Sequence, residues 1–166
     1  MATFVVENLA MPMIRKTLMA FVALLLVPGV APAQEEIYKG IPFARLEKIL
    51  DDLKIKYKKS PGLGPNDWFY EYVKNNYQLR VTNFNGEDLM LDAIFPATPV
   101  AKVNTWNVKR QLVRAVLYPP RNPVMAYTAL EANLDCMGGT SDALIRHFIN
   151  AFDGQVAAFD KYLQSK

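Results

Sequence analysis

The spacing of apolar residues changes between helical and strand-like along the chain. Over residues 43–53, apolar side chains recur every three or four positions with charged side chains between them, which predicts an amphipathic helix. Residues 54–58 instead alternate lysine with an apolar residue, the period of a half-buried strand. Residues 60–67 are dense in glycine, proline and asparagine and therefore form a loop. The four lysines of this part are expected to protect an exposed sheet edge against pairing with another chain: Lys54, Lys56, Lys58 and Lys59.

Three strands joined by two tight turns are predicted next. Residues 68–73 are aromatic and β-branched, and the two asparagines at 75–76 can adopt the positive φ of a hairpin turn. Residues 77–84 alternate apolar with polar side chains. The Asn-Gly pair at 85–86 is the strongest short hairpin signal and joins them to a strand at 89–95. The result is an antiparallel meander.

The second half of the domain is expected to contain two more helices and two more strands. A helix is predicted at about 97–110, followed by strands at 112–118 and 124–134. A last helix begins near Thr140, which can cap it, and carries a long apolar stripe. The predicted fold class is α+β, with an antiparallel sheet of about five to six strands covered by helices on one face, in the order α-β-β-β-β-α-β-β-α.

The N-terminal stretch has the features of a secretory signal. A basic pair precedes the apolar run 18–27, and the small-x-small sequence at 31–33 follows a Pro-Gly break. This predicts a signal peptide over residues 1–33, cleaved before Gln34, and hence a periplasmic or secreted protein of bacterial type. The apolar run is shorter than the 20 or so residues of a membrane span, although an uncleaved anchor is the alternative. Translation can start at any of three methionines: Met1, Met11 or Met13.

The rest of the chain is predicted to form one domain that contains few residues of the types used in catalysis or metal binding. A short flexible tail is expected at 34–40 and a single domain at 41–166. The formal net charge of the whole chain, +3, does not favour nucleic-acid binding, and a single cysteine excludes an internal disulfide. The sequence shows no cofactor or metal motif. A small hydrolase is the enzymatic alternative, and it could draw only on these nucleophiles and base: Ser60, Ser141, Ser165, Cys136 and His147.

The stretch around the second tryptophan is where a helical pattern turns into a strand. Trp106 shares a helix face with Arg110, so the indole is expected to anchor the helix on the sheet with the guanidinium over its ring. Asn104 and Asn107 form an i,i+3 pair that can satisfy backbone groups at this corner. Their role is therefore predicted to be structural.

Two local patterns and the order of elements carry a family resemblance. The patterns are Val-Asn-Thr-Trp-Asn at 103–107 followed by Arg114-Ala-Val-Leu, and Leu-Asp-Cys-Met-Gly-Gly-Thr at 134–140, which contains Gly138 and Gly139. With them the chain resembles the YbjN family of bacterial proteins, which is described as putative sensory transduction regulators. The resemblance implies a fold similar to type III secretion chaperones and a regulatory, non-enzymatic role.

Two classes of function are compared. The first is a periplasmic binding or regulatory protein, chaperone-like, that holds an unknown protein partner on a sheet face or edge and has no membrane span after cleavage. Aromatic residues expected on an uncovered sheet face would form its partner surface, and the domain could form a homodimer through it: Trp68, Tyr70 and Tyr72. The alternatives are the small hydrolase and a carrier of a hydrophobic ligand.

Overall fold

The computed structural model describes residues 35–165. Within them the chain forms three helices and six strands in the predicted order, which confirms the α+β fold class. The predicted signal peptide and its cleavage before Gln34 lie outside the described residues. The elements in chain order are α2 (Phe43–Asp52), β1 (Tyr57–Pro61), β2 (Trp68–Lys74), β3 (Tyr77–Phe84), β4 (Asp88–Pro96), α3 (Val100–Lys109), β5 (Arg114–Tyr118), β6 (Tyr127–Asp135) and α4 (Asp142–Gln164).

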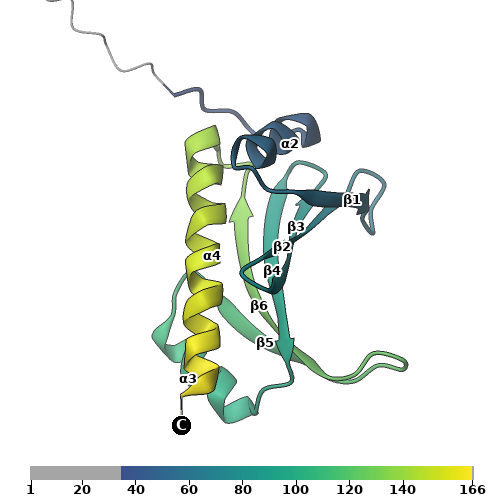
Figure 1. Ribbon diagram of the computed structural model, residues 1–166. Coiled ribbons are helices and arrows are strands. Elements are labelled where there is room, and N and C mark those ends of the chain that lie inside the picture. The colour runs from purple at the N-terminus through teal and green to yellow at the C-terminus, as the bar shows by residue number, and fades with distance from the viewer. Residues whose placement is uncertain (1–34, 166) are drawn as a thin grey trace, which may run out of the picture. The chain divides into compact units, whose positions relative to one another are not determined.

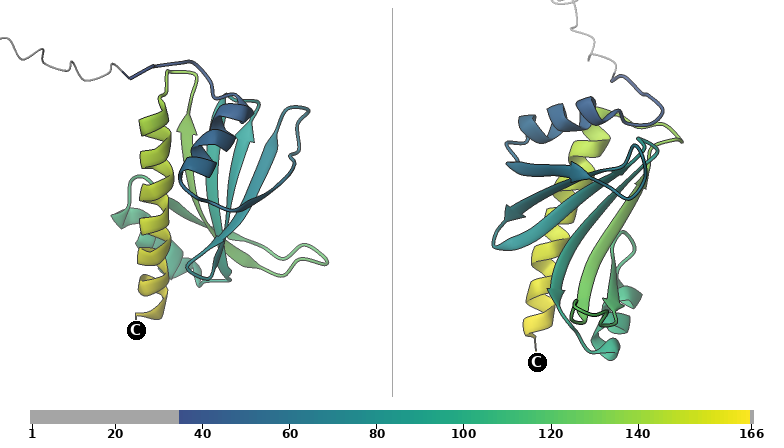
Figure 2. Two further views of the ribbon diagram at one scale, coloured as in Figure 1. Left: turned by 45° about the horizontal axis from the view of Figure 1, so that its top comes forward. Right: turned by 90° about the vertical axis from the view of Figure 1, so that its right-hand side faces the viewer.

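All six strands form one antiparallel sheet in the order β1-β2-β3-β4-β6-β5. The two turns of the predicted meander are present, and the asparagines at 75, 76 and 85 have positive φ angles as those turns require. Figure 1 shows the long helix α4 running along one face of the sheet, with α2 and α3 towards its two ends. The other views show the same arrangement, and the opposite face of the sheet carries no helix (Figure 2).

Strand alternation divides the side chains between these two faces. On β4, the residues Leu89, Leu91, Ala93 and Phe95 are buried against the helices, whereas Ile94 points to the open face and is partly exposed. The strand register aligns the same parity on the neighbouring strands, so their core residues stack into a continuous layer. We call the side without helices the open face.

Several element ends differ from the predicted ones because local backbone chemistry decides them. Strand β1 begins at Tyr57 rather than at residue 54, since Lys54 adopts a left-handed φ of 58° and Ile55 N–H still bonds to Leu50 O at 3.0 Å. The cap of α4 is Ser141, whose Oγ accepts from the N–H of Leu144 at 3.2 Å. Thr140 was the predicted cap; it pairs with Tyr38 in an isolated β-bridge instead.

The end of the predicted tail at 34–40 is tied to the rest of the domain. Tyr38 and Thr140 exchange two backbone hydrogen bonds of 2.9 and 2.8 Å. Asp142 accepts from the Tyr38 hydroxyl and from Arg45 Nε, each at 2.7 Å. Burial acts to raise the pKa of the Asp142 carboxyl, but these two hydrogen bonds and the positive charges of Arg45 and Arg146 together outweigh it, and the pKa is lowered. The contacts join the N-terminal segment, α2 and the start of α4.

Candidate functional site

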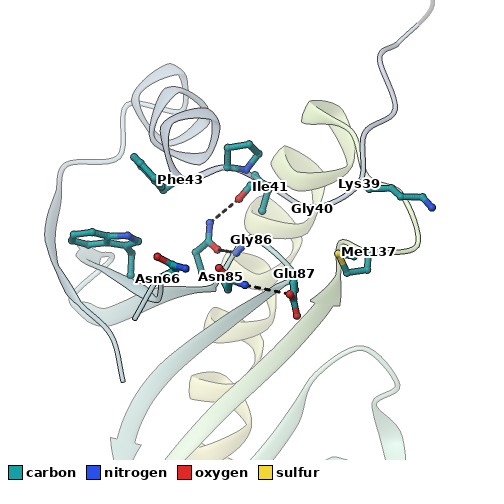
Figure 3. A pocket seen from close by; sticks show the side chains of 12 residues that line it. Lys39, Gly40, Ile41, Phe43, Asn66, Asn85, Gly86, Glu87 and Met137 are labelled. Atoms are coloured by element: carbon teal, nitrogen blue, oxygen red, sulfur yellow. Dashed lines mark hydrogen bonds between the residues drawn. The ribbon is translucent and has the colours of Figure 1, made fainter. Parts of the chain in front are cut away.

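A pocket of about 420 Å³ lies at the end of the sheet where β2, the β3–β4 turn and α2 meet. Figure 3 shows its lining, which comes from four separate parts of the chain. They are the segment leading into α2, the β1–β2 loop with the start of β2, the β3–β4 turn, and the turn before α4. We call it the Trp68 pocket, because Trp68 is one of its walls and was the residue predicted at a partner surface.

The floor of the Trp68 pocket is held by one buried side chain. Asn83 is 1% exposed; its amide donates to Ile41 O at 3.0 Å and its carbonyl oxygen accepts from Gly86 N at 2.6 Å. The Ile41 N–H donates in turn to Gly86 O at 2.6 Å. Gly86 has a φ of 79°, and a side chain there would begin 3.0 Å from Ile41 O, so glycine fits both the turn and the close approach. The floor is therefore fixed before any ligand binds.

The aromatic wall is also held in place. The ring of Phe43 lies 6.3 Å from that of Trp68 and is tilted by 48°. The ammonium of Lys59 lies 3.9 Å from the centre of the Trp68 ring and forms a 2.6 Å ion pair with Glu47. Glu47 also accepts from the Tyr70 hydroxyl at 3.2 Å. Lys59, one of the lysines predicted to protect the sheet edge, therefore orients the tryptophan.

The pocket combines an open apolar wall with few charges. Phe43 and Met137 are each 50% exposed, although both are large apolar side chains. Lys39 and Glu87 are the ionisable residues of its lining, and Glu87 accepts from the side chain of Asn85 at 3.2 Å. The lining contains no serine, cysteine or histidine that could serve as a nucleophile or imidazole base. Its composition suits binding of an apolar or aromatic group rather than catalysis.

The structure separates the three aromatic residues predicted at a partner surface. Tyr70 is fully buried and Tyr72 is 5% exposed, so the prediction that they form an exposed surface is wrong. Their register partners are Val81 and Leu79, which lie on the side of the sheet that the helices cover. Burial is the main reason that the pKa of both hydroxyls is raised. Trp68 has the same orientation but lies at the end of the strand, where the helix cover stops and the pocket opens.

Trp106 and Asn107 have the structural roles expected from the sequence, whereas the side chain of Asn104 makes no hydrogen bond to another described residue. Trp106 is 3% exposed and lies under the guanidinium of Arg110, whose Cζ is 4.5 Å from the ring centre. Asn107 donates to Ala115 O at 2.9 Å and accepts from Ala115 N at 2.8 Å, which fixes the start of β5 next to α3. Asn104 is exposed on the other side of the helix. β5 begins at Arg114 rather than at residue 112.

Of the remaining family-motif residues, Met137 lines the pocket, whereas Arg114, Gly138 and Gly139 lie outside it. Arg114 pairs with Glu131 at 3.1 Å on the open face. Gly138 and Gly139 form the turn before α4, where Gly139 has a φ of 109° and its N–H bonds to Cys136 O at 3.3 Å. Sequence reasoning missed Phe43 and Asn83 as pocket residues. Asn83 could have been found, because it continues the core-facing parity of its strand two residues before Asn85 of the Asn-Gly turn.

The candidate nucleophiles are not assembled into a site. Cys136 is fully buried, and burial raises the pKa of its thiol to about 11, which disfavours the reactive thiolate. Ser141 caps α4, and the hydroxyl of Ser165 donates to Tyr162 O at 2.6 Å. His147 is exposed on α4. Residues 35–165 contain no cluster of three or more metal-ligating side chains and no helix that is long and apolar enough to cross a membrane.

Comparisons with known proteins found a family model and a solved structure that match this chain. Residues 42–165 match the family model YbjN, whose description is "Putative bacterial sensory transduction regulator". A solved structure, described as YbjN, a putative transcription regulator from E. coli, superposes with a TM-score of 0.57 at 13% identity and covers 71% of this chain and 87% of its own. At this identity the superposition supports the fold alone. No curated protein matches the chain significantly.

Proposed function

Because the chain belongs to the YbjN family, whose description is "Putative bacterial sensory transduction regulator", we propose that it is a non-enzymatic regulator that binds a protein partner through the Trp68 pocket. The observation that carries the proposal is the fixed aromatic wall beside a hydrogen-bonded floor. Trp68 is oriented by Lys59 and Phe43 before a partner arrives, so little side-chain freedom is lost on binding. Tryptophan in a pre-organised pocket is a frequent anchor of protein interfaces.

The form of the pocket favours a protein segment over a free hydrophobic molecule. Its rim carries Lys39, Glu87 and the exposed side chain of Asn85, so a ligand meets polar groups beside the apolar wall. A polypeptide supplies apolar side chains together with backbone donors and acceptors, which suits this mixture. The occupant we propose is one apolar or aromatic side chain of the partner, flanked by its backbone. A second copy of the domain has the required chemistry and is one partner that the test below can identify.

The proposed site of action is the periplasm or the extracellular space. It rests on the basic start, apolar run and small-x-small sequence of residues 1–33, which together resemble a cleavable secretory signal. The intact mass of the exported protein is expected to correspond to a chain beginning at Gln34. A product that retains the apolar run and sediments with the inner membrane would contradict both the cleavage and the location.

Replacing Trp68 with alanine is expected to abolish capture of the partner. The truncation removes the aromatic wall of the pocket and the indole ring that Lys59 contacts. Trp68 is only partly buried, so the domain is expected to stay folded. The measurement is a pull-down from a periplasmic extract with tagged domain, read out by quantitative mass spectrometry against the unmodified domain.

The matched control is Phe69→Ala, the neighbouring aromatic residue whose side chain points to the open face of the same strand. It is expected to retain the proteins that Trp68→Ala loses. If the two variants capture identical sets, or if the loss is confined to Phe69→Ala, the Trp68 pocket is not the binding site. Far-UV circular dichroism of both variants establishes that each is folded.

A further inference from the structure

Strand β6 is longer than β5, its neighbour on the outer side, so part of its outer edge is not covered by β5. β5 pairs with β6 from Tyr127 to Glu131, and no strand of the described chain borders residues 132–135 on that side. Figure 1 shows β5 alongside only part of β6, with α4 running beside the remainder. This free edge lies away from the Trp68 pocket and shares none of its lining residues.

The backbone of the free edge offers unpaired hydrogen-bonding groups. Cys136 N–H donates to Glu87 O at 2.8 Å, on the side of β4. Because successive residues of an antiparallel strand point their backbone groups to opposite sides, the even-numbered residues of β6 bond to β4 and the odd-numbered ones face β5. On the β5 side, Glu131 lies opposite Arg114, whereas no described strand lies opposite Asn133 or Asp135 there. Their N–H and C=O groups are those that an added strand would pair with.

A groove of about 300 Å³ lies between this edge and α4. Its lining is largely apolar, and Leu112 and Leu144 remain 80% and 41% exposed there. Ala132 and Leu134, which face the helices, form its strand side, and Phe148 belongs to its helix side. Every second side chain of a strand added at the edge would therefore enter an apolar groove, as one face of a strand requires.

The groove ends in a basic cavity. A second cavity of about 190 Å³ shares Leu112, Val113, Ala132 and Asn133 with the groove and is also lined by Arg110 and Arg114. Arg110 has no carboxylate partner among the described residues, and Arg114 is paired with Glu131, whose second oxygen accepts from the Tyr118 hydroxyl. The single carboxylate in the cavity lining is therefore already neutralised, and one positive charge is left over.

We propose that the free edge of β6 binds the C-terminal segment of a partner protein as an added antiparallel strand, with its terminal carboxylate at Arg110 and Arg114. An antiparallel strand at residues 132–135 runs in the direction of β5 and meets the start of β5 at Arg114, so the chain must end or turn away there. A chain that ends presents a carboxylate to the leftover positive charge. Backbone pairing, apolar side chains and the terminal charge are thus recognised by three adjoining parts of the surface.

The test uses a panel of immobilised seven-residue peptides with free C-termini and the same panel with amidated C-termini. Fluorescently labelled domain is expected to bind a subset of the free peptides that have apolar residues at alternate positions. Amidation is expected to weaken these by about tenfold or more, because a charge-assisted interaction is lost. No selective binding, or binding that is unchanged by amidation, would overturn the proposal, and this comparison does not depend on any variant being folded.

Two matched pairs of variants locate the site. Asn133→Pro removes the N–H that faces the free edge without touching the bonds to β4 and is expected to abolish binding, whereas Asn133→Ala is expected to retain it. Arg110→Ala should weaken binding of the free peptides to the level of the amidated ones, and Lys109→Ala, its exposed neighbour outside the cavity, should not. Equal binding by the proline and alanine variants at position 133 would exclude strand addition at this edge. Binding through the Trp68 pocket is measured separately, so either proposal can fail alone.

Discussion

Replacing Trp106 with alanine is expected to lower the free energy of unfolding by about 3–5 kcal/mol. The indole is 3% exposed and packs edge-on against Phe159 at 4.8 Å and beside Tyr162 at 5.4 Å, so it joins α3 to α4. Phe159 in turn packs edge-on against Phe95 of β4 at 4.9 Å. Removing the indole leaves a cavity among three elements that cannot all close around it. Urea unfolding, followed by circular dichroism, measures the loss.

The matched control for Trp106 is Val108→Ala. Val108 is on the same helix but 87% exposed, so its truncation is expected to change the free energy of unfolding by no more than about 0.5 kcal/mol. A Trp106→Ala protein with an unchanged urea midpoint would show that the indole is not the anchor of α3. Trp106→Phe is expected to be milder than alanine, because the buried indole N–H has no hydrogen-bond partner to lose.

Replacing Asn83 with alanine is expected to destabilise the domain by about 2–4 kcal/mol. The change removes both hydrogen bonds of the pocket floor and leaves Ile41 O and Gly86 N without their side-chain partner in a buried place. Asn66→Ala is the matched control, because Asn66 lines the same pocket but is exposed. Equal urea midpoints for the two variants would mean that the floor is not fixed by Asn83, and the pre-organisation of the Trp68 pocket would lose its basis.

The order of the elements could be predicted because each has its own local signal. The helical spacing of apolar residues in α2, the Asn-Gly turn at 85–86 and the apolar stripe of α4 do not depend on the rest of the fold. The family resemblance rests on the same kind of signal, since Trp106 and Asn107 hold the corner between α3 and β5. Such residues indicate how the domain folds and carry no information on a ligand.

The partner surface could not be predicted correctly, because the alternation of side chains along a strand does not show which face of the sheet is covered. The period of β2 shows that Tyr70 and Tyr72 share one face and Phe69 shares the other with Val73, but it does not show which face the helices cover. That choice is made by the packing of α2 and α4, which are distant in the sequence. For the same reason the Trp68 pocket, with lining from four separate segments, has no signature in any single stretch.

The free edge of β6 depends on where two strands end. The sequence predicts strands at 112–118 and 124–134, and the structure shortens the first to Arg114–Tyr118. A shift of two residues in a strand start is ordinary in sequence-based reasoning, yet here it decides whether an edge is covered.

The central claim, that a protein partner occupies the Trp68 pocket, is tested most directly by photocrosslinking in living cells. A benzoylphenylalanine residue is placed at position 68 and, in separate strains, at Phe69 and Val73, both of which point to the open face. The account predicts a discrete crosslinked adduct from position 68 and none from the other two. An adduct from Val73 or Phe69 without one from position 68 would contradict it and would assign the partner to the open face of the sheet.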